Sequence, residues 1–274
     1  MVAYIFVLLG VVRERVALTM IYLDMVLYSA GGIIGTMHHL YFSGEPAMHM
    51  ALGAFFSAAE VIPLTILTFE AWSFVQLGAK QKSETHFPHF WAVMFLSSVG
   101  FWNFLGAGIF GFLINLPIVS YYEIGTALTP NHAHASMMGV YGMLSVGLAL
   151  FCQRYMIPES RWSDRAAKIS FWSLNLGLAW MVFATLFPLG ILQLYHSVSY
   201  GYFDARTLQF ITSGANPVLE WLRLPGDTLF IIGGVLPILY LSWLSIRHMR
   251  PAVKASEEFE EVLFTEVIER PEAH

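Results

Sequence analysis

The sequence predicts an all-α integral membrane protein, a single-domain bundle of about six transmembrane helices. Of its 274 residues, 57% are hydrophobic and only 12% are charged, which is too little charge to cover a soluble domain of this length. Apolar runs repeatedly approach the roughly 20 residues that a helix needs to cross a hydrocarbon core of about 30 Å. Runs of this length indicate helices rather than a β-barrel.

The apolar runs place six spans along residues 1–250. The second and fifth are longer than the bilayer requires and are expected to tilt or project from it. The first residues, MVAYIFVLLGVV, are too short to cross, and we expect them to be the last half of a helix whose beginning is missing, in a fragment or a split gene product. The acidic stretch 251–274 is expected to be a solvated tail. The expected spans are 16–37, 47–78, 89–115, 131–154, 167–199 and 225–248.

The distribution of basic residues predicts the orientation. All of the 14 Lys and Arg residues flank the spans on one side, except Arg206 and Arg223 in the loop after the fifth span. The basic side is therefore expected to be cytoplasmic, together with the C-terminus. No basic patch of the kind that binds nucleic acid is present. A single cysteine, Cys152, excludes an intramolecular disulfide and a cysteine-based zinc site.

Two pairs of histidines lie at the outward ends of two spans. His38 and His39 end the first span, and His132 and His134 lie in the first turn of the fourth. Adjacent helical residues diverge by about 100°, so the first pair shares one metal only where the helix unwinds, which the nearby Gly44 permits. Residues two apart diverge by about 200°, which suits two flat cofactors on opposite faces. Interfacial hydrogen bonding is the alternative for any one histidine. The remaining histidines are expected to be interfacial or tail residues: His49, His86, His89, His196, His248 and His274.

Glu60 is an acidic residue deep in an apolar span. Counted from Pro46, which suits the first turn of a helix, Glu60 lies about 21 Å along the axis of the second span. A carboxyl at this depth is costly unless it faces the bundle interior, water or a proton path. Glu60 is therefore a candidate for proton transfer, with a purely structural role as the alternative. Pro63 is expected to kink the helix, and Asp24 and Glu70 lie nearer the cytoplasmic end, where water solvates them.

These segments resemble the heme–copper oxidase superfamily and, within it, the nitric oxide reductases. GTMHHLYFSG resembles the segment that supplies two of three histidines to the distal metal, and NHAHASMMGVYG resembles the segment that binds both hemes. The resemblance covers all six spans and corresponds to the C-terminal half of a twelve-helix catalytic core. It implies two b-type hemes and a non-heme iron in a bacterial cytoplasmic membrane, with the histidines towards the periplasm. The implied ligands are His38 and His39 for the non-heme iron, His132 for the high-spin heme and His134 for the low-spin heme.

Two further residues match positions of this family. Glu60 matches the glutamate that nitric oxide reductases keep near the binuclear centre, which favours NO over oxygen as the substrate. The segment WLRLPGDTLF resembles the quinol-oxidising, single-chain branch, in which an aspartate near this point lies by the quinol pocket. Asp227 is the candidate for that aspartate, and a helix N-cap is its alternative role.

The resemblance implies the reduction of two NO molecules to nitrous oxide and water, with quinol as the electron donor. Two metals a few ångströms apart would hold two NO molecules side by side, so that the N–N bond forms without a chance encounter. Glu60 would help to deliver protons. Imidazole also suits copper, so the ligand type alone does not identify the distal metal.

One departure from the family bears on activity. The family takes the third distal-metal histidine and the second low-spin heme ligand from earlier helices, whereas no histidine precedes His38. We therefore expect the chain alone to be inactive, and to need an N-terminal half in the same protein or in a second polypeptide.

Two other interpretations are open at this point. The chain could be the equivalent part of an oxygen-reducing terminal oxidase, which would be distinguished by copper and by the reduction of O2. It could also be a non-enzymatic remnant or heme-free scaffold. The adjacent upstream reading frame would then lack a histidine-bearing helix bundle.

Overall fold

The computed structural model describes residues 2–8, 12–33, 44, 46–59, 62–63, 65–66, 69 and 88–248, and within these ranges it is helical without any strand. Four helices in this part are long and apolar enough to cross a membrane. They agree with the third to sixth predicted spans, although the last begins earlier than expected. The protein is thus an all-α integral membrane protein. The four helices are Phe90–Ile114, Leu128–Met156, Asp164–Tyr200 and Asn216–His248.

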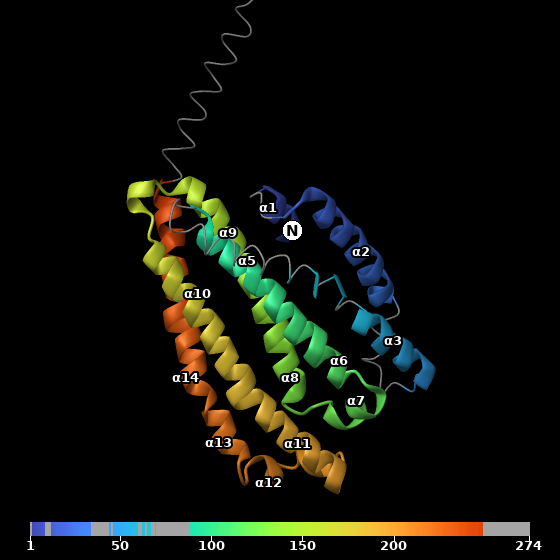
Figure 1. The fold of residues 1–274 in the computed structure, drawn as a ribbon. Coiled ribbons are helices and arrows are strands. Elements are labelled where there is room, and N and C mark those ends of the chain that lie inside the picture. The colour runs from blue at the N-terminus through green and yellow to red at the C-terminus, as the bar shows by residue number, and fades with distance from the viewer. Residues whose placement is uncertain are drawn as a thin grey trace, which may run out of the picture.

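The N-terminal helices lie on one side of the bundle, away from the last span (Figure 1). They are α1 (Val2–Leu8), α2 (Glu14–Ile33) and α3 (Ala47–Ala59). Helix α2 follows the predicted first span as far as Ile33, and α3 forms the start of the second. Beyond α3, only residues 62–63, 65–66 and 69 of the second span are described, and the end of the first span and the acidic tail 251–274 lie outside the described residues.

Each long helix contains a π-helical segment in its interior, which the apolar pattern does not predict. A π turn is wider than an α turn, and such turns often occur at functional sites. The third span consists of α5 (Phe90–Trp102), η2 (Asn103–Phe110) and α6 (Gly111–Ile114). The fourth consists of α8 (Leu128–Ala133), η3 (His134–Gly142) and α9 (Met143–Met156). The fifth consists of α10 (Asp164–Ala179), η5 (Trp180–Leu186) and α11 (Phe187–Tyr200). The sixth contains α13 (Asn216–Trp221), α14 (Arg223–Thr228) and η7 (Leu229–Val235), and it stays helical to His248.

Short helices join these spans at the two ends of the bundle. Helix α7 (Pro117–Glu123), η6 (Asp204–Arg206) and α12 (Leu208–Ile211) connect spans at the end where α8 begins, and we name this end the histidine end (Figure 1). The helix η4 (Glu159–Arg161) turns the chain at the opposite end. Ser163 then caps α10, because its Oγ accepts a hydrogen bond of 3.2 Å from the Ala166 amide.

The third span is the centre of the core. Helix α5 packs against α9 and α10, and η2 packs against η3. Phe95 is fully buried and meets Phe171 edge to face, with ring centroids 5.2 Å apart. Trp102 is also buried, and its Nε1 donates a 2.8 Å hydrogen bond to Asn175 Oδ1. These contacts fix the third span against the fifth.

The last two spans pack through donors on one helix and backbone carbonyls on the other. Ser170 Oγ donates to Gly234 O at 2.6 Å, and Trp180 Nε1 donates to Leu222 O at 2.8 Å. Hydrogen bonds of this kind, together with small residues at the contact, hold helices together in a membrane, where the apolar faces gain little from leaving lipid.

The buried aromatic core predicts a position-dependent effect of truncation. Phe95→Ala removes a fully buried ring and should destabilise the protein by about 3–5 kcal/mol. Phe101→Ala on the same helix removes a ring that is 49% exposed and should have a much smaller effect. The apparent melting temperature of the detergent-solubilised protein reports the stability of both variants, and equal losses would contradict the core assignment.

Candidate functional site

The two histidines of the fourth span lie where α8 meets η3. His132 is in the last turn of α8, and His134 is the first residue of η3. Nδ1 of His132 donates to Gly106 O of the third span, and Nδ1 of His134 donates to Pro130 O of its own helix, each at 2.7 Å. Because a carbonyl oxygen only accepts, Nδ1 has the proton in both rings and Nε2 has the lone pair. This is the tautomer in which a histidine ligates a metal through Nε2.

The π turn in η2 presents the carbonyl that holds His132. The backbone partner of Gly106 O is the N–H of Gly111, five residues further on. The same oxygen also accepts the hydrogen bond from His132, since a carbonyl has two lone pairs. A side chain at position 111 would obstruct the ring, because a Cβ there would lie 2.9 Å from His132 Cε1. The third span thus provides both the acceptor and the space for His132.

The donor chemistry of these two imidazoles fits axial ligation of heme. In each ring a backbone carbonyl holds Nδ1, which fixes the orientation of the ring and leaves Nε2 as the nitrogen with ligand character. Within residues 2–69 and 88–248, as far as they are described, no three His, Cys, Asp or Glu side chains lie together as a metal site. The predicted distal-metal ligands His38 and His39 and the predicted proton-transfer residue Glu60 lie outside the described residues.

An apolar cavity adjoins the turn that contains the histidines. Its volume is about 220 Å³, and it lies between α6, α7, α8 and α11. Asn131, the residue before His132, is its polar lining residue; it is 1% exposed, and its Oδ1 has no hydrogen-bond partner in the described structure. The apolar lining includes Phe110, Leu116, Val119, Phe187 and Ile191. The cavity therefore suits a small uncharged molecule.

Asp227 lies inside a helix rather than at its start. Helix α14 begins at Arg223, and Arg223 Nε lies 3.6 Å from Asp227 Oδ2. The alternative role as a helix N-cap is therefore wrong, because the chain is already helical before the Pro-Gly pair. Apolar surface hollows of about 520 and 540 Å³ flank this helix, lined by residues of the ranges 217–225 and 224–233. Asp227 itself is not one of their lining residues.

Glu123 and Arg206 are polar residues of the histidine end that the sequence patterns did not identify as functional. Glu123 is 3% exposed, and its Oε2 accepts a 2.9 Å hydrogen bond from Thr129 Oγ1. Burial raises the pKa of Glu123 to about 7, although the Thr129 hydrogen bond and the Arg206 charge oppose the rise. The sequence does contain one indication of them, because both are isolated charges. Glu123 is the one acidic residue of 116–130, and Arg206 is one of the two Lys or Arg residues expected on this side.

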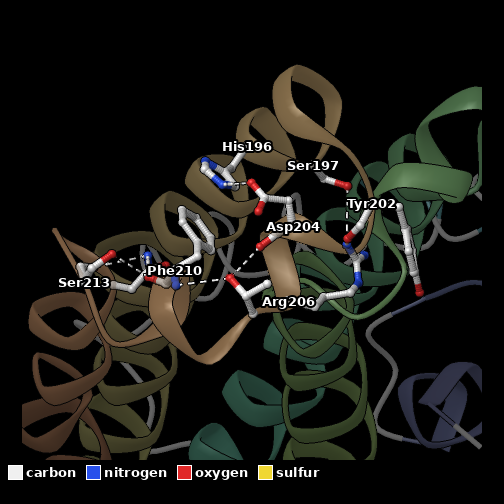
Figure 2. Close-up of polar contacts among 9 residues, drawn as sticks. His196, Ser197, Tyr202, Asp204, Arg206, Phe210 and Ser213 are labelled. Carbon is white, nitrogen blue, oxygen red and sulfur yellow. Dashed lines mark hydrogen bonds and ion pairs between the residues drawn. The ribbon is translucent and has the colours of Figure 1, made fainter.

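Close to this pair, another histidine of the same end has an acidic partner. His196 Nε2 lies 3.1 Å from Asp204 Oδ2, and its ring stacks on Phe210 at a centroid distance of 3.8 Å (Figure 2). An interfacial role was expected for His196; it lies in the last turns of α11, and these contacts join it to Asp204 of η6 and Phe210 of α12.

Two comparisons with known proteins bear on this arrangement. Residues 1–229 match the family of cytochrome c and quinol oxidase polypeptide I. A nitric oxide reductase subunit from Stutzerimonas stutzeri is 27% identical over 260 residues, which is 93% of this chain and 53% of that relative. The chain thus spans about half the length of the curated relative. Because the family match extends over most of the chain, as the histidine segments predict, the chain belongs to the cytochrome c and quinol oxidase polypeptide I family of heme–copper oxidases.

Proposed function

We propose that this chain is the C-terminal part of a membrane-bound respiratory nitric oxide reductase, which reduces two NO to nitrous oxide and water with quinol as the electron donor. The main support is the likeness to the nitric oxide reductase of Stutzerimonas stutzeri over 93% of the chain. Since the chain covers 53% of that relative, the proposed partner is an N-terminal half, in the same protein or in a second polypeptide. Exposed apolar surface supports this: only 28% of an 18-residue apolar stretch of span four and 22% of that of span six are buried.

The proposed cofactors are two b-type hemes and a non-heme iron. His132 would hold the high-spin heme and His134 the low-spin heme, and His38 and His39 would be two ligands of the iron. When bound, these groups would supply the electron transfer and NO binding of the reaction 2 NO + 2 e⁻ + 2 H⁺ → N2O + H2O. The Nδ1 hydrogen bonds of His132 and His134 support the proposal, because they orient both rings before any metal binds.

The fold supports bringing the two histidine pairs to one end. The first pair lies in the sequence between α2 and α3, and α3 packs against α6 and α7 of the histidine end. In the proposed orientation this end faces the periplasm. Glu60 would hold and pass on a proton, and Asp227, beside the apolar hollows of α14, would lie near the quinol.

The proposal is tested on the purified membrane complex that contains this chain. Heme and non-heme iron are quantified, and NO consumption is measured with a reduced quinol. We expect two hemes and one non-heme iron per complex, together with NO turnover. Copper in place of non-heme iron, with O2 reduction, would support the oxidase alternative. A heme-free complex without turnover would indicate the scaffold.

The two histidines of the fourth span should have separable effects. His132→Ala should remove the high-spin heme signal and leave part of the low-spin signal, and His134→Ala should do the reverse, because the two rings have different neighbours. Electronic absorption and electron paramagnetic resonance spectra of the complexes measure both signals. Equal loss of both signals in each variant would argue that the helix collapses instead.

Glu60→Gln should lower NO turnover about 100-fold or more, since a neutral amide cannot transfer the proton. The heme spectra should stay unchanged. Glu70→Gln, ten residues later in the same predicted span, is the matched control and should retain most activity. Similar activities for the two variants would exclude Glu60 from proton transfer.

A further inference from the structure

Arg206 binds the backbone of the loop that leads into the histidine-bearing helix. Its Nη2 donates to the carbonyl oxygens of Tyr122, at 3.2 Å, and Ile124. Its Nη1 donates to Ser197 Oγ at 3.3 Å and to Tyr202 O. The guanidinium also lies over the Tyr202 ring, with Cζ 3.5 Å from the centroid (Figure 2). One half-buried side chain thus joins the end of α11, η6 and residues 122–127, which are the end of α7 and the turn that follows it and are named the loop from here on.

The same loop is held from α11 by two uncharged side chains. Ser197 Oγ donates to Tyr122 O at 2.9 Å, and Gln193 Oε1 accepts from the Ala127 amide at 2.6 Å. Gly125 has a φ of 83°, and a Cβ there would lie 3.2 Å from Arg206 Nε. The turn therefore uses the conformation that glycine adopts freely, and it lets the guanidinium lie against the backbone.

Glu123 lies within this loop and contacts the helix that follows. Its hydrogen-bond donor, Thr129, is in α8, three residues before His132. Arg206 is the charged group that acts on its carboxyl. The elements packed most closely against α7 are α11, α6 and α3. Helix α11 presents Gln193 and Ser197 to the loop and also contains Tyr195, His196 and Tyr200; α6 contains no titratable residue, and α3 contains His49.

A displacement of the loop would move His132 and His134, because the loop leads directly into the continuous helix that contains both. Residues 128–142 are helical without a break from α8 into η3. The His132 hydrogen bond to Gly106 measures 2.7 Å, and a shift of even about 1 Å at this point would break it or distort it. The loop thus sets the position of α8 relative to the third span.

We propose that Arg206 and Glu123 form a clamp that positions His132 and His134, and that proton exchange at Glu123 adjusts how tightly the clamp holds the loop. This inference rests on the proposed ligation of heme by these two histidines. Neither residue reacts with substrate; both act through the loop backbone and through Thr129.

The direction of the pH effect follows from the pKa of Glu123. Because burial raises this pKa from 4.5 to about 7, the folded loop favours the neutral carboxyl. The neutral carboxyl stabilises the folded loop fully below about pH 4.5, which is the ordinary pKa of a glutamate. This stabilisation is lost as the pH rises through about 7, the pKa in the folded loop. The clamp should therefore hold the loop more tightly at pH 6 than at pH 8.

The test is amide hydrogen exchange of residues 121–129 in the intact membrane complex, together with its heme absorption spectrum, at pH 6 and pH 8. After correction for the intrinsic pH dependence of exchange, the native loop should exchange several-fold faster at pH 8. Glu123→Gln should remove this difference. Arg206→Gln should speed exchange of the loop about tenfold at both pH values and shift the heme spectrum. Arg206→Lys should give partial rescue, since it keeps the charge without the planar fork of donors.

Matched controls separate the clamp from general charge effects. Arg161→Gln removes an exposed cation at the opposite end, and Glu220→Gln removes an exposed carboxylate in α13; neither should alter the loop. Amide exchange in α10 detects global unfolding. If Arg206→Gln unfolds the bundle, the test of the clamp is whether Glu123→Gln removes the pH difference in loop exchange. Unchanged loop exchange and spectra in heme-loaded Arg206→Gln and Glu123→Gln would overturn the clamp alone. Absence of heme from the native complex would instead overturn the proposed function.

Discussion

The hydrogen bond from His132 Nδ1 to Gly106 O is the interaction on which the site depends. It joins the third and fourth spans and fixes the ring tautomer. It forms where η2 widens, and there the Gly111 amide, five residues further on, donates to Gly106 O. Within a membrane an unpaired backbone group costs several kcal/mol, and Gly106 O is paired both with the Gly111 N–H and with His132 Nδ1. The histidine is positioned by backbone as much as by side-chain packing.

Most of the described fold could be predicted because bilayer thickness sets the length of an apolar run. Spans three to five lie close to their predicted ranges and span six ends where it was predicted to end, since nothing in those ranges interrupts the apolar pattern. The π segments could not be predicted, because widening a helix changes its hydrogen-bond register and leaves its apolar composition unchanged. The early start of the last span was missed for a related reason: Pro225 and Gly226 resemble a helix boundary, yet the chain is helical on both sides of them.

The candidate site was predictable only in its side-chain chemistry. Two histidines with the spacing of His132 and His134 are visible in the sequence, whereas the carbonyl that orients the first of them has no residue-type signature. The contact of Arg206 with Tyr122 spans 84 positions, so no local pattern contains it. The proposed distal ligands and Glu60 lie outside the described residues, and their roles stay predictions from the family resemblance.

The clamp at the histidine end recognises main-chain atoms. Arg206 donates to the carbonyls of residues 122 and 124, which every amino acid supplies, so the identity of these two side chains has little influence on the contact. Position 125 is different, because its positive φ and its closeness to the guanidinium both favour glycine. We therefore expect relatives that keep this contact to vary at 122 and 124 but to retain glycine at 125 together with arginine at 206. Low sequence similarity in this loop is a poor guide to whether its geometry has been retained.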